Sequence, residues 1–280
     1  MKRLIVNADD FGLAESVNLG IIKGHAEGIV TSATLLACCD AAGHASELAK
    51  GYPKLGVGVH LCLTRERPVL DPKHIPTITK GGAFLPSPFS FMARLMSGQV
   101  NISEVEAELR AQIEKAISLG ITPTHIDGHQ HIHIMPGVIN TALRLAKEYS
   151  IPSVRYPVGP WAGRTGLARA FEKIVLEGIA SSRRGIIVSS GISSPDYFFG
   201  LNYTGSLDSE SLCGIISCLP EGSSEIMCHP GLANRALADS TDWGHGWERE
   251  LDAVCSRKVK EYVQMKKIEL INYAGLRETR

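Results

Sequence analysis

A short histidine-rich tract is the first place in this chain where residue types and spacing point to chemistry. The sequence HIDGHQHIH, which runs from His125 to His133, holds four of the chain's ten histidines. Imidazole and carboxylate groups bind divalent metal ions and transfer protons near neutral pH. On an extended strand, His129, His131 and His133 would share one face, so they cannot all reach the same ion. The tract therefore indicates a metal site only if other ligands come from elsewhere in the chain.

Candidate partners stand at the ends of three other short apolar runs. Asp9 and Asp10 lie in NADDFG, His60 ends GVGVH, and His229 follows EIMC. Taken singly, adjacent aspartates are typical of a turn or a helix cap, and a lone histidine is typical of a core residue. Two neighbouring carboxylates after a buried strand repel each other unless a cation or a proton lies between them. Together, these groups indicate a metal site.

A site with one carboxylate and two imidazoles suits a divalent ion that acts as a Lewis acid. Such an ion lowers the pKa of a bound water to roughly 7 in favourable sites. Zinc fits the nitrogen and oxygen ligands, with magnesium, cobalt, nickel and manganese left open by ligand type alone. The second aspartate is then free to take a proton from the water, and a separate histidine could protonate a leaving group. This division of labour is what hydrolysis of an amide needs.

Short apolar runs alternate with helical patterns along the chain, which predicts parallel strands connected by helices. The predicted strands are Leu4–Val6, Ile29–Ala37, Leu55–His60, Thr124–Asp127, Val154–Tyr156, Tyr197–Phe199, Glu225–Cys228 and Ile268–Ile271. Seven or eight such units predict an irregular (β/α) barrel in a single α/β domain over residues 1–280, with a doubly wound open sheet as the alternative. In both folds, active sites gather at the carboxyl ends of the strands, which is where the candidate ligands lie.

The helical patterns have recognisable ends. A helix is expected to end near Gly28, and another to begin at Ser103, where SEVE resembles a capping box closed by Glu106. Further helices are expected after Pro136-Gly137 and over Leu167–Ala180, Ser209–Cys218 and Trp247–Gln264. Two irregular segments interrupt the alternation: an insertion over 64–100, expected to lie near the active site, and a loop over 231–246.

Composition excludes several classes of protein. Lys+Arg and Asp+Glu both number 29, so the basic excess typical of nucleic-acid binders is absent, and no nucleic-acid partner is expected. The N-terminal residues do not resemble a signal peptide, and no apolar run approaches the length of a transmembrane span. The seven cysteines include no CxxC pair, which is typical of free thiols in a reducing compartment. A cytoplasmic protein is therefore expected.

The four motifs occur in the order found in a known family. With NADDFG, GVGVHLCLT, PTHIDGHQHIH and EIMCHP, the chain resembles the YdjC-like carbohydrate deacetylases, which include chitooligosaccharide deacetylases. Within that family it is most similar to members associated with hopanoid biosynthesis. The resemblance implies an irregular (β/α) barrel and the metal-dependent removal of an acetyl group from an N-acetylated sugar.

The resemblance also implies roles for individual residues. Asp10, His60 and His129 would hold one divalent ion, with zinc or magnesium expected first. Asp9 would be the general base towards a metal-bound water, and His229 the general acid.

Supporting roles, in substrate binding or in orienting the ligands, are expected for His125, His131 and Arg155. The substrate would be N-acetylglucosamine in a soluble oligosaccharide or in a glycosylated hopanoid lipid, and the lipid would require peripheral membrane contact. A homodimer is expected by resemblance.

Two other readings remain open at this point. A metal-dependent phosphoesterase or another amidohydrolase could use the same ligands, although the chain lacks a phosphate-binding glycine loop. A non-catalytic module that binds sugar or metal would keep the ligands, but it would not need both Asp9 and His229.

Overall fold

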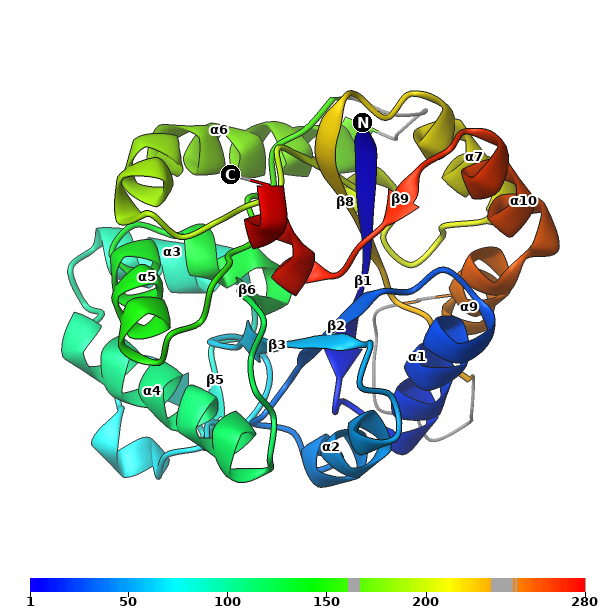
Figure 1. Ribbon diagram of the computed structural model, residues 1–280. Coiled ribbons are helices and arrows are strands. Elements are labelled where there is room, and N and C mark those ends of the chain that lie inside the picture. The colour runs from blue at the N-terminus through cyan, green and yellow to red at the C-terminus, as the bar shows by residue number, and fades with distance from the viewer. Residues whose placement is uncertain (161–166, 233–243, 245, 280) are drawn as a thin grey trace.

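The computed structural model describes residues 1–160, 167–232, 244 and 246–279. Its centre is a curled sheet of parallel strands, and the helices lie around the outside of that sheet (Figure 1). Along the sheet, the strands follow the order β6 (Ile126–Gly128), β3 (Gly56–Leu61), β2 (Ser32–Leu35), β1 (Lys2–Phe11), β8 (Gly222–Cys228) and β7 (Tyr197–Phe199), and β9 (Glu269–Leu270) pairs with β1. The predicted α/β architecture with parallel strands is therefore confirmed.

Isolated bridges join the two edges of this sheet. Val154 forms a parallel bridge with Ile126 of β6, and Ser153 forms one with Ser193, which lies just before β7. Val154 N donates to Ser193 O at 2.8 Å, and Phe198 N of β7 donates to Val158 O at 3.0 Å. These links curl the sheet into an irregular barrel, as the alternation of strands and helices predicted, rather than a doubly wound open sheet. The predicted strand at Val154–Tyr156 is reduced to such bridges.

Most of the helices lie around the sheet and bury apolar residues on one side, either against the strands, as α1 and α4 do, or against neighbouring helices. Their bounds are α1 (Glu15–Glu27), α2 (Ala42–Lys50), α3 (Pro88–Met96), α4 (Ile102–Ser118), α5 (Val138–Glu148), α6 (Leu167–Ser190), α7 (Ser209–Ser217), α9 (Trp247–Cys255) and α10 (Arg257–Met265). Short 3₁₀ helices are η1 (Pro72–His74), η2 (His129–Ile134), η3 (Leu201–Tyr203) and η4 (Tyr273–Thr279). In the part of the chain that is described, no helix combines the length and apolarity needed to cross a membrane.

Two local expectations about helices were wrong. The capping box at Ser103 does not form, because α4 begins one residue earlier and the side chain of Asn101 accepts a hydrogen bond from Ser103 N. Glu106 instead forms salt bridges with arginines on the surface. The helix expected over Trp247–Gln264 is broken at Ser256, whose ψ of 129° is not helical.

The insertion over 64–100 contains η1, a two-stranded sheet of β4 (Thr79–Lys80) and β5 (Ala83–Phe84), and α3. Its first part is fastened to α4, because the buried carboxylate of Glu108 accepts hydrogen bonds from Val69 N and Leu70 N. The position of this insertion beside the active site stays a prediction. Most of the irregular loop expected over 231–246 lies outside the described residues.

Candidate functional site

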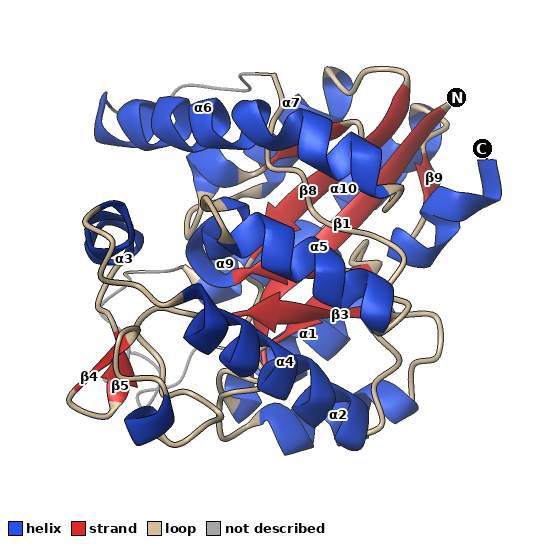
Figure 2. Cartoon of the chain, turned by 90° about the vertical axis from the view of Figure 1, so that its left-hand side faces the viewer, coloured by secondary structure: helices blue, strands red, loops and turns tan. Residues whose placement is uncertain are grey.

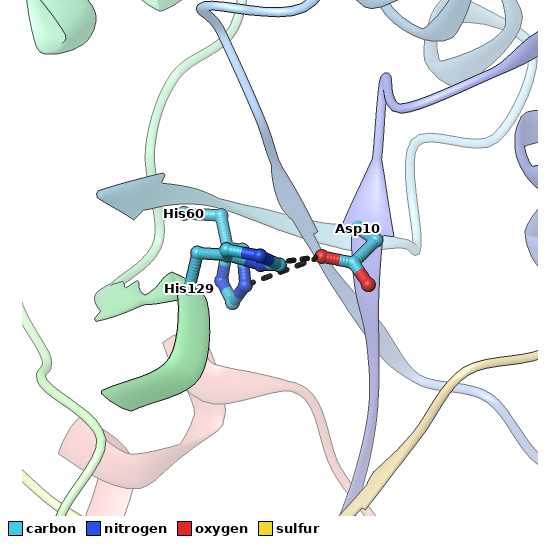
Figure 3. Close-up of side chains that lie close together, drawn as sticks. All are labelled: Asp10, His60 and His129. Carbon is cyan, nitrogen blue, oxygen red and sulfur yellow. Dashed lines mark hydrogen bonds and ion pairs between the residues drawn. The ribbon is translucent and has the colours of Figure 1, made fainter. Parts of the chain in front are cut away.

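Three predicted ligands meet at the carboxyl ends of β1, β3 and β6 (Figure 3). Asp10 Oδ1 lies 3.0 Å from His129 Nδ1 and 3.6 Å from His60 Nε2. One ligand atom from each residue lies within 4.8 Å of the others, and all three side chains are buried. The sequence motifs that carry these residues are far apart along the chain, and the barrel brings them to one point.

The end of β1 is irregular, and this lets both aspartates face the same side. Pairing with β2 shifts register between Ala8 and Phe11, and Asp10 has a φ of 65°. In a regular strand, neighbouring side chains point to opposite faces. Here His60 Nε2 lies 3.6 Å from Asp10 Oδ1 and 4.0 Å from Asp9 Oδ2. The NADDFG sequence therefore delivers two carboxylates to one imidazole.

The histidine tract leaves the strand immediately after Gly128 and forms η2. Gln130 and His131 have positive φ values of 52° and 56°, in the left-handed region that non-glycine residues seldom adopt. This sharp bend separates the side chains of the tract, so that His129 alone among the three alternating histidines joins Asp10 and His60.

The other two alternating histidines are buried beside different partners. The ring of His131 packs edge-on against Phe198 with 5.5 Å between centroids, and His133 Nε2 donates to the carbonyl oxygen of Arg155 at 3.1 Å. Burial lowers the pKa of both imidazoles, to about 4 for His133. Both rings are therefore neutral near pH 7, and neither belongs to the group formed by Asp10, His60 and His129.

His60 is fixed from behind by a carboxylate. Its Nδ1 donates to Asp127 Oδ1 at 2.6 Å, which leaves the lone pair of Nε2 directed towards Asp10. Burial would raise the pKa of Asp127, but the guanidinium of Arg155 lowers it, so that Asp127 is ionised. A carboxylate that holds the second nitrogen of a ligand histidine is a common support of metal sites. Asp127 is therefore a further functional candidate, which was not predicted although it lies within the histidine tract.

Asp9 accepts hydrogen bonds from two residues, Arg155 and Asn7. The guanidinium of Arg155 forms a two-pronged contact, with Nη1 at 2.7 Å from Oδ2 and Nη2 at 2.6 Å from Oδ1. Asn7 Nδ2 donates to the same Oδ1 at 2.8 Å. Burial would raise the pKa of Asp9, but Arg155 outweighs it and holds the pKa well below its usual range. Asp9 is thus an oriented anion.

Arg155 is completely buried, and its nitrogens contact carboxylates. Arg155 binds the carboxylate of Asp9, and a contact between Arg155 and the substrate stays a prediction.

His229 follows β8 and is supported by Glu250 of α9. Its backbone N donates to Glu250 Oε2 at 2.6 Å, and its Nδ1 lies 3.8 Å from the same oxygen. Burial alone would lower the pKa of His229, but Glu250, helped by Asp10 and Asp9, raises it to about 9. A protonated imidazole therefore stands near the two aspartates at neutral pH. Glu250 was not predicted, because nothing in the sequence near it marks it as a partner.

His125, the first histidine of the tract, lies deeper in the barrel. Its Nε2 lies 3.1 Å from Asn7 Oδ1, its Nδ1 lies 2.9 Å from Thr124 Oγ1, and its ring stacks on Tyr273 with 3.6 Å between centroids. Burial lowers the pKa of His125 to about 3. It therefore contacts Asn7, one of the two residues that hold Asp9, and its expected supporting role towards the ligands or the substrate stays a prediction.

The donor set at Asp10, His60 and His129 fits a divalent metal ion. Asp9, His60 and Asp127 form a second group of similar compactness, but Arg155 binds both of its carboxylates. Asp10 instead faces the two imidazoles. One oxygen and two nitrogen donors in a buried site are a ligand set that zinc accepts, and in catalytic sites of this kind water or substrate completes the coordination.

The chain is similar to known proteins over nearly its whole length. The profile of the YdjC-like protein family matches residues 3–265. A carbohydrate deacetylase from Clostridium beijerinckii is 35% identical, over 98% of this chain and all of its own length. A chitooligosaccharide deacetylase from Yersinia enterocolitica is 30% identical, over 98% of both chains. A solved structure from Enterococcus faecalis is 29% identical, covers 98% of both chains and superposes with a TM-score of 0.79.

Proposed function

This chain belongs to the YdjC-like protein family, and we propose that it hydrolyses the acetamide group of an N-acetylated sugar with the help of a divalent metal ion. The observation that carries the proposal is the meeting of Asp10, His60 and His129 next to Asp9. The names of the relatives, carbohydrate deacetylase and chitooligosaccharide deacetylase, support the substrate class.

The ion would be held by Asp10, His60 and His129. When bound, it supplies Lewis acidity, which polarises the acetyl carbonyl and lowers the pKa of a water molecule. Two imidazole nitrogens among the donors favour zinc over magnesium, which prefers oxygen ligands. Asp127 fixes the proton on His60 Nδ1 and so keeps Nε2 available as a ligand.

Asp9 would accept the proton of the attacking water. Arg155 and Asn7 keep its carboxylate oriented, and they remove any need for it to reorganise during the reaction. The same pairing makes Asp9 a weak base, because its pKa lies below the usual range. A base of this kind is effective only towards a water that is already acidified, which is consistent with a metal-dependent mechanism.

His229 would protonate the departing amine. An amide nitrogen leaves poorly unless it gains a proton, and an imidazole whose pKa is raised to about 9 carries that proton at neutral pH. The products would be acetate and the free amino sugar.

The sugar could belong to a soluble oligosaccharide or to a glycosylated lipid. Two apolar side chains of α3, Phe89 and Met96, are 60% and 81% exposed. They would suit a substrate with an apolar portion if the insertion lies beside the site, as the sequence predicts. The hopanoid assignment rests on sequence resemblance alone. A cytoplasmic location, peripheral membrane contact and a homodimer also stay predictions.

Acetate release over a panel of N-acetylglucosamine oligosaccharides and glycolipids tests the proposal. We expect turnover that a chelator abolishes and added zinc restores. Phosphate release from phosphorylated sugars without acetate release would favour a phosphoesterase, and binding without turnover would favour a non-catalytic module.

Two variants separate the proposed roles. Asp9→Asn is expected to retain the metal and lose turnover, whereas His129→Ala is expected to lose both. His74→Ala, which removes an exposed histidine of η1, is the control and should retain both. Equal metal content in the Asp9 and His129 variants would contradict the assignment.

A further inference from the structure

A buried carboxylate and a buried phenol lie behind Arg155, on the side away from the metal-ligand group. Glu225 Oε1 accepts from Arg155 Nε at 2.9 Å and lies 2.8 Å from Nη2. Its second oxygen, Oε2, accepts from the hydroxyl of Tyr273 at 2.5 Å. Both side chains are fully buried, and the proposed roles of Asp9, Asp10 and His229 do not involve them.

Tyr273 comes from the C-terminal segment, beyond the residues that match the family profile. This segment follows β9, which pairs with Arg3 and Leu4 at the start of β1. Figure 2 shows it beside the amino end of β1, whereas the metal-ligand group lies at the carboxyl ends of the strands. The Tyr273 side chain packs with Ile5 and Leu276 in a small apolar cluster of its own. The C-terminal segment therefore reaches the interior of the barrel from the end opposite the site.

Both groups that hold Asp9 can be traced back to Tyr273. The first route runs through polar contacts, because Tyr273 binds Glu225, Glu225 binds Arg155, and the Arg155 fork holds the carboxylate of Asp9. Glu225 contacts the edge of the guanidinium that carries Nε and Nη2. It therefore fixes the direction in which the two Nη atoms point.

The second route runs through ring stacking. The ring of Tyr273 lies flat on His125, with an angle of 9° between their planes, and His125 Nε2 contacts Asn7 Oδ1. Asn7 Nδ2 then donates to Asp9. Because the side-chain oxygen of Asn7 is engaged by His125, its amide nitrogen must face Asp9. One tyrosine thus constrains both donors that orient the same carboxylate.

We propose that Tyr273 and Glu225 are positioning residues that hold Asp9 in its reactive orientation through Arg155 and Asn7, so that the C-terminal segment is part of the catalytic apparatus. The inference rests on the proposed function, since it assigns Asp9 a chemical role. A purely structural role for the buried network predicts a different outcome, in which losing the tyrosine hydroxyl lowers stability and leaves the turnover of the folded enzyme unchanged.

Tyr273→Phe tests the inference, because it removes one hydroxyl and keeps the ring that stacks on His125. Tyr262→Phe is the matched control, since Tyr262 is a half-buried residue of α10 whose ring lies near the Lys266 ammonium. In the metal-loaded protein we expect Tyr273→Phe to lower kcat for acetate release by about 10-fold, with KM and metal content unchanged, as for a slightly misplaced catalytic group. Tyr262→Phe should match the wild type.

Two further measurements keep the test decisive. Glu225→Gln is expected to lower kcat in the same way, and combining it with Tyr273→Phe should add little, because both act on one route. In the metal-free protein, the Nε–H resonance of Arg155 should shift in Tyr273→Phe and not in Tyr262→Phe. If Tyr273→Phe does not fold, kcat and the Arg155 resonance of Glu225→Gln are compared with those of the wild type instead.

The outcomes separate this inference from the proposed function. No acetate release by the wild type would refute the proposed function, and the inference with it. Wild-type turnover together with unchanged kcat in the folded Tyr273 or Glu225 variant, or an unmoved Arg155 resonance, would overturn the inference alone.

Discussion

Replacing Asp127 by asparagine isolates the contribution of the residue that supports a metal ligand. Asp127 Oδ1 accepts from His60 Nδ1 at 2.6 Å, and Oδ2 binds Arg155 Nη1 at 2.8 Å. Asparagine has the same shape, but it offers one acceptor and one NH₂ group. Whichever way the amide turns, one of these two contacts places a donor against a donor. If the NH₂ group faces His60, the imidazole favours the tautomer that carries its hydrogen on Nε2. A protonated Nε2 has no free lone pair and cannot bind a metal.

The loss of the His60–Asp127 contact sets the expected decrease in metal affinity. Removing the partner that orients a ligand histidine costs about 10- to 100-fold in metal affinity, which corresponds to about 1.4–2.7 kcal/mol. The upper half of this range is expected for Asp127→Asn, because the contact is short, fully buried and made by an ionised acceptor. The ligands themselves are untouched, so the site should still bind zinc, only more weakly.

Competition titration of the metal-free protein with a chromogenic zinc chelator measures this change. Glu108→Gln is the control, because it makes the same carboxylate-to-amide change in a buried residue that binds the backbone at Val69 and Leu70. It should alter stability and leave zinc affinity unchanged. Wild-type affinity in folded Asp127→Asn would refute the argument that this carboxylate sets the tautomer of His60.

Two further predictions concern pH and packing. Glu250 raises the pKa of His229 to about 9, so kcat should fall as the pH rises through about 9 and His229 loses its proton. Glu250→Gln should move this fall in the pH profile of kcat to lower pH. A fall at the same pH in this variant would exclude His229 as the general acid. A Cβ on Gly58 would lie 2.6 Å from the ring of His125, so Gly58→Ala should lower the free energy of unfolding in urea by about 1–3 kcal/mol. Gly43→Ala, where a Cβ meets nothing within 4 Å, should instead change it by less than about 1 kcal/mol, and equal losses in both would contradict the packing argument.

The meeting of Asp10, His60 and His129 could be predicted from sequence because it depends on a general property of parallel sheets. Every strand in such a sheet points the same way, so residues that follow successive strands arrive at one edge. The alternation of apolar runs with helical patterns was enough to predict that edge. The motifs then supplied the chemistry.

The supporting residues could not be predicted in the same way. Glu225 lies within a strand, Glu250 on a helix and Tyr273 after the last strand. Glu225 is the first residue of the EIMCHP motif, but nothing in that motif indicates which cation it binds, and neither Glu250 nor Tyr273 stands beside a motif. Their partners are fixed by register and by the closing of the barrel, as in the pairing of Glu225 with Ile5 across β1 and β8. A buried charge of this kind becomes recognisable only when the cation that compensates it, Arg155, is located.

The wrong local predictions have a related cause. SEVE satisfies the pattern of a capping box, but Asn101 is an equally good cap and lies two residues earlier, so the pattern does not decide between two starts of one helix. Likewise, the apolar period continues through Ser256, because α9 packs on α1 and α7 and α10 packs on α7, although the backbone between them leaves the helical region. Periodicity reports which face is buried and does not report whether the backbone is continuous.

The two adjacent aspartates raise a question of charge that the structure answers residue by residue. Asp9 is neutralised by Arg155, so it needs no metal to be stable as a buried anion. Asp10 has no comparable contact with Arg155; burial alone would raise its pKa, and the ring of His129 lowers it to about 2. The imidazoles of His129 and His60 can either accept a proton or bind a metal, and they are weaker counter-charges than a guanidinium. The divalent ion that we propose would therefore bind beside Asp10, while Asp9 would remain available for proton transfer.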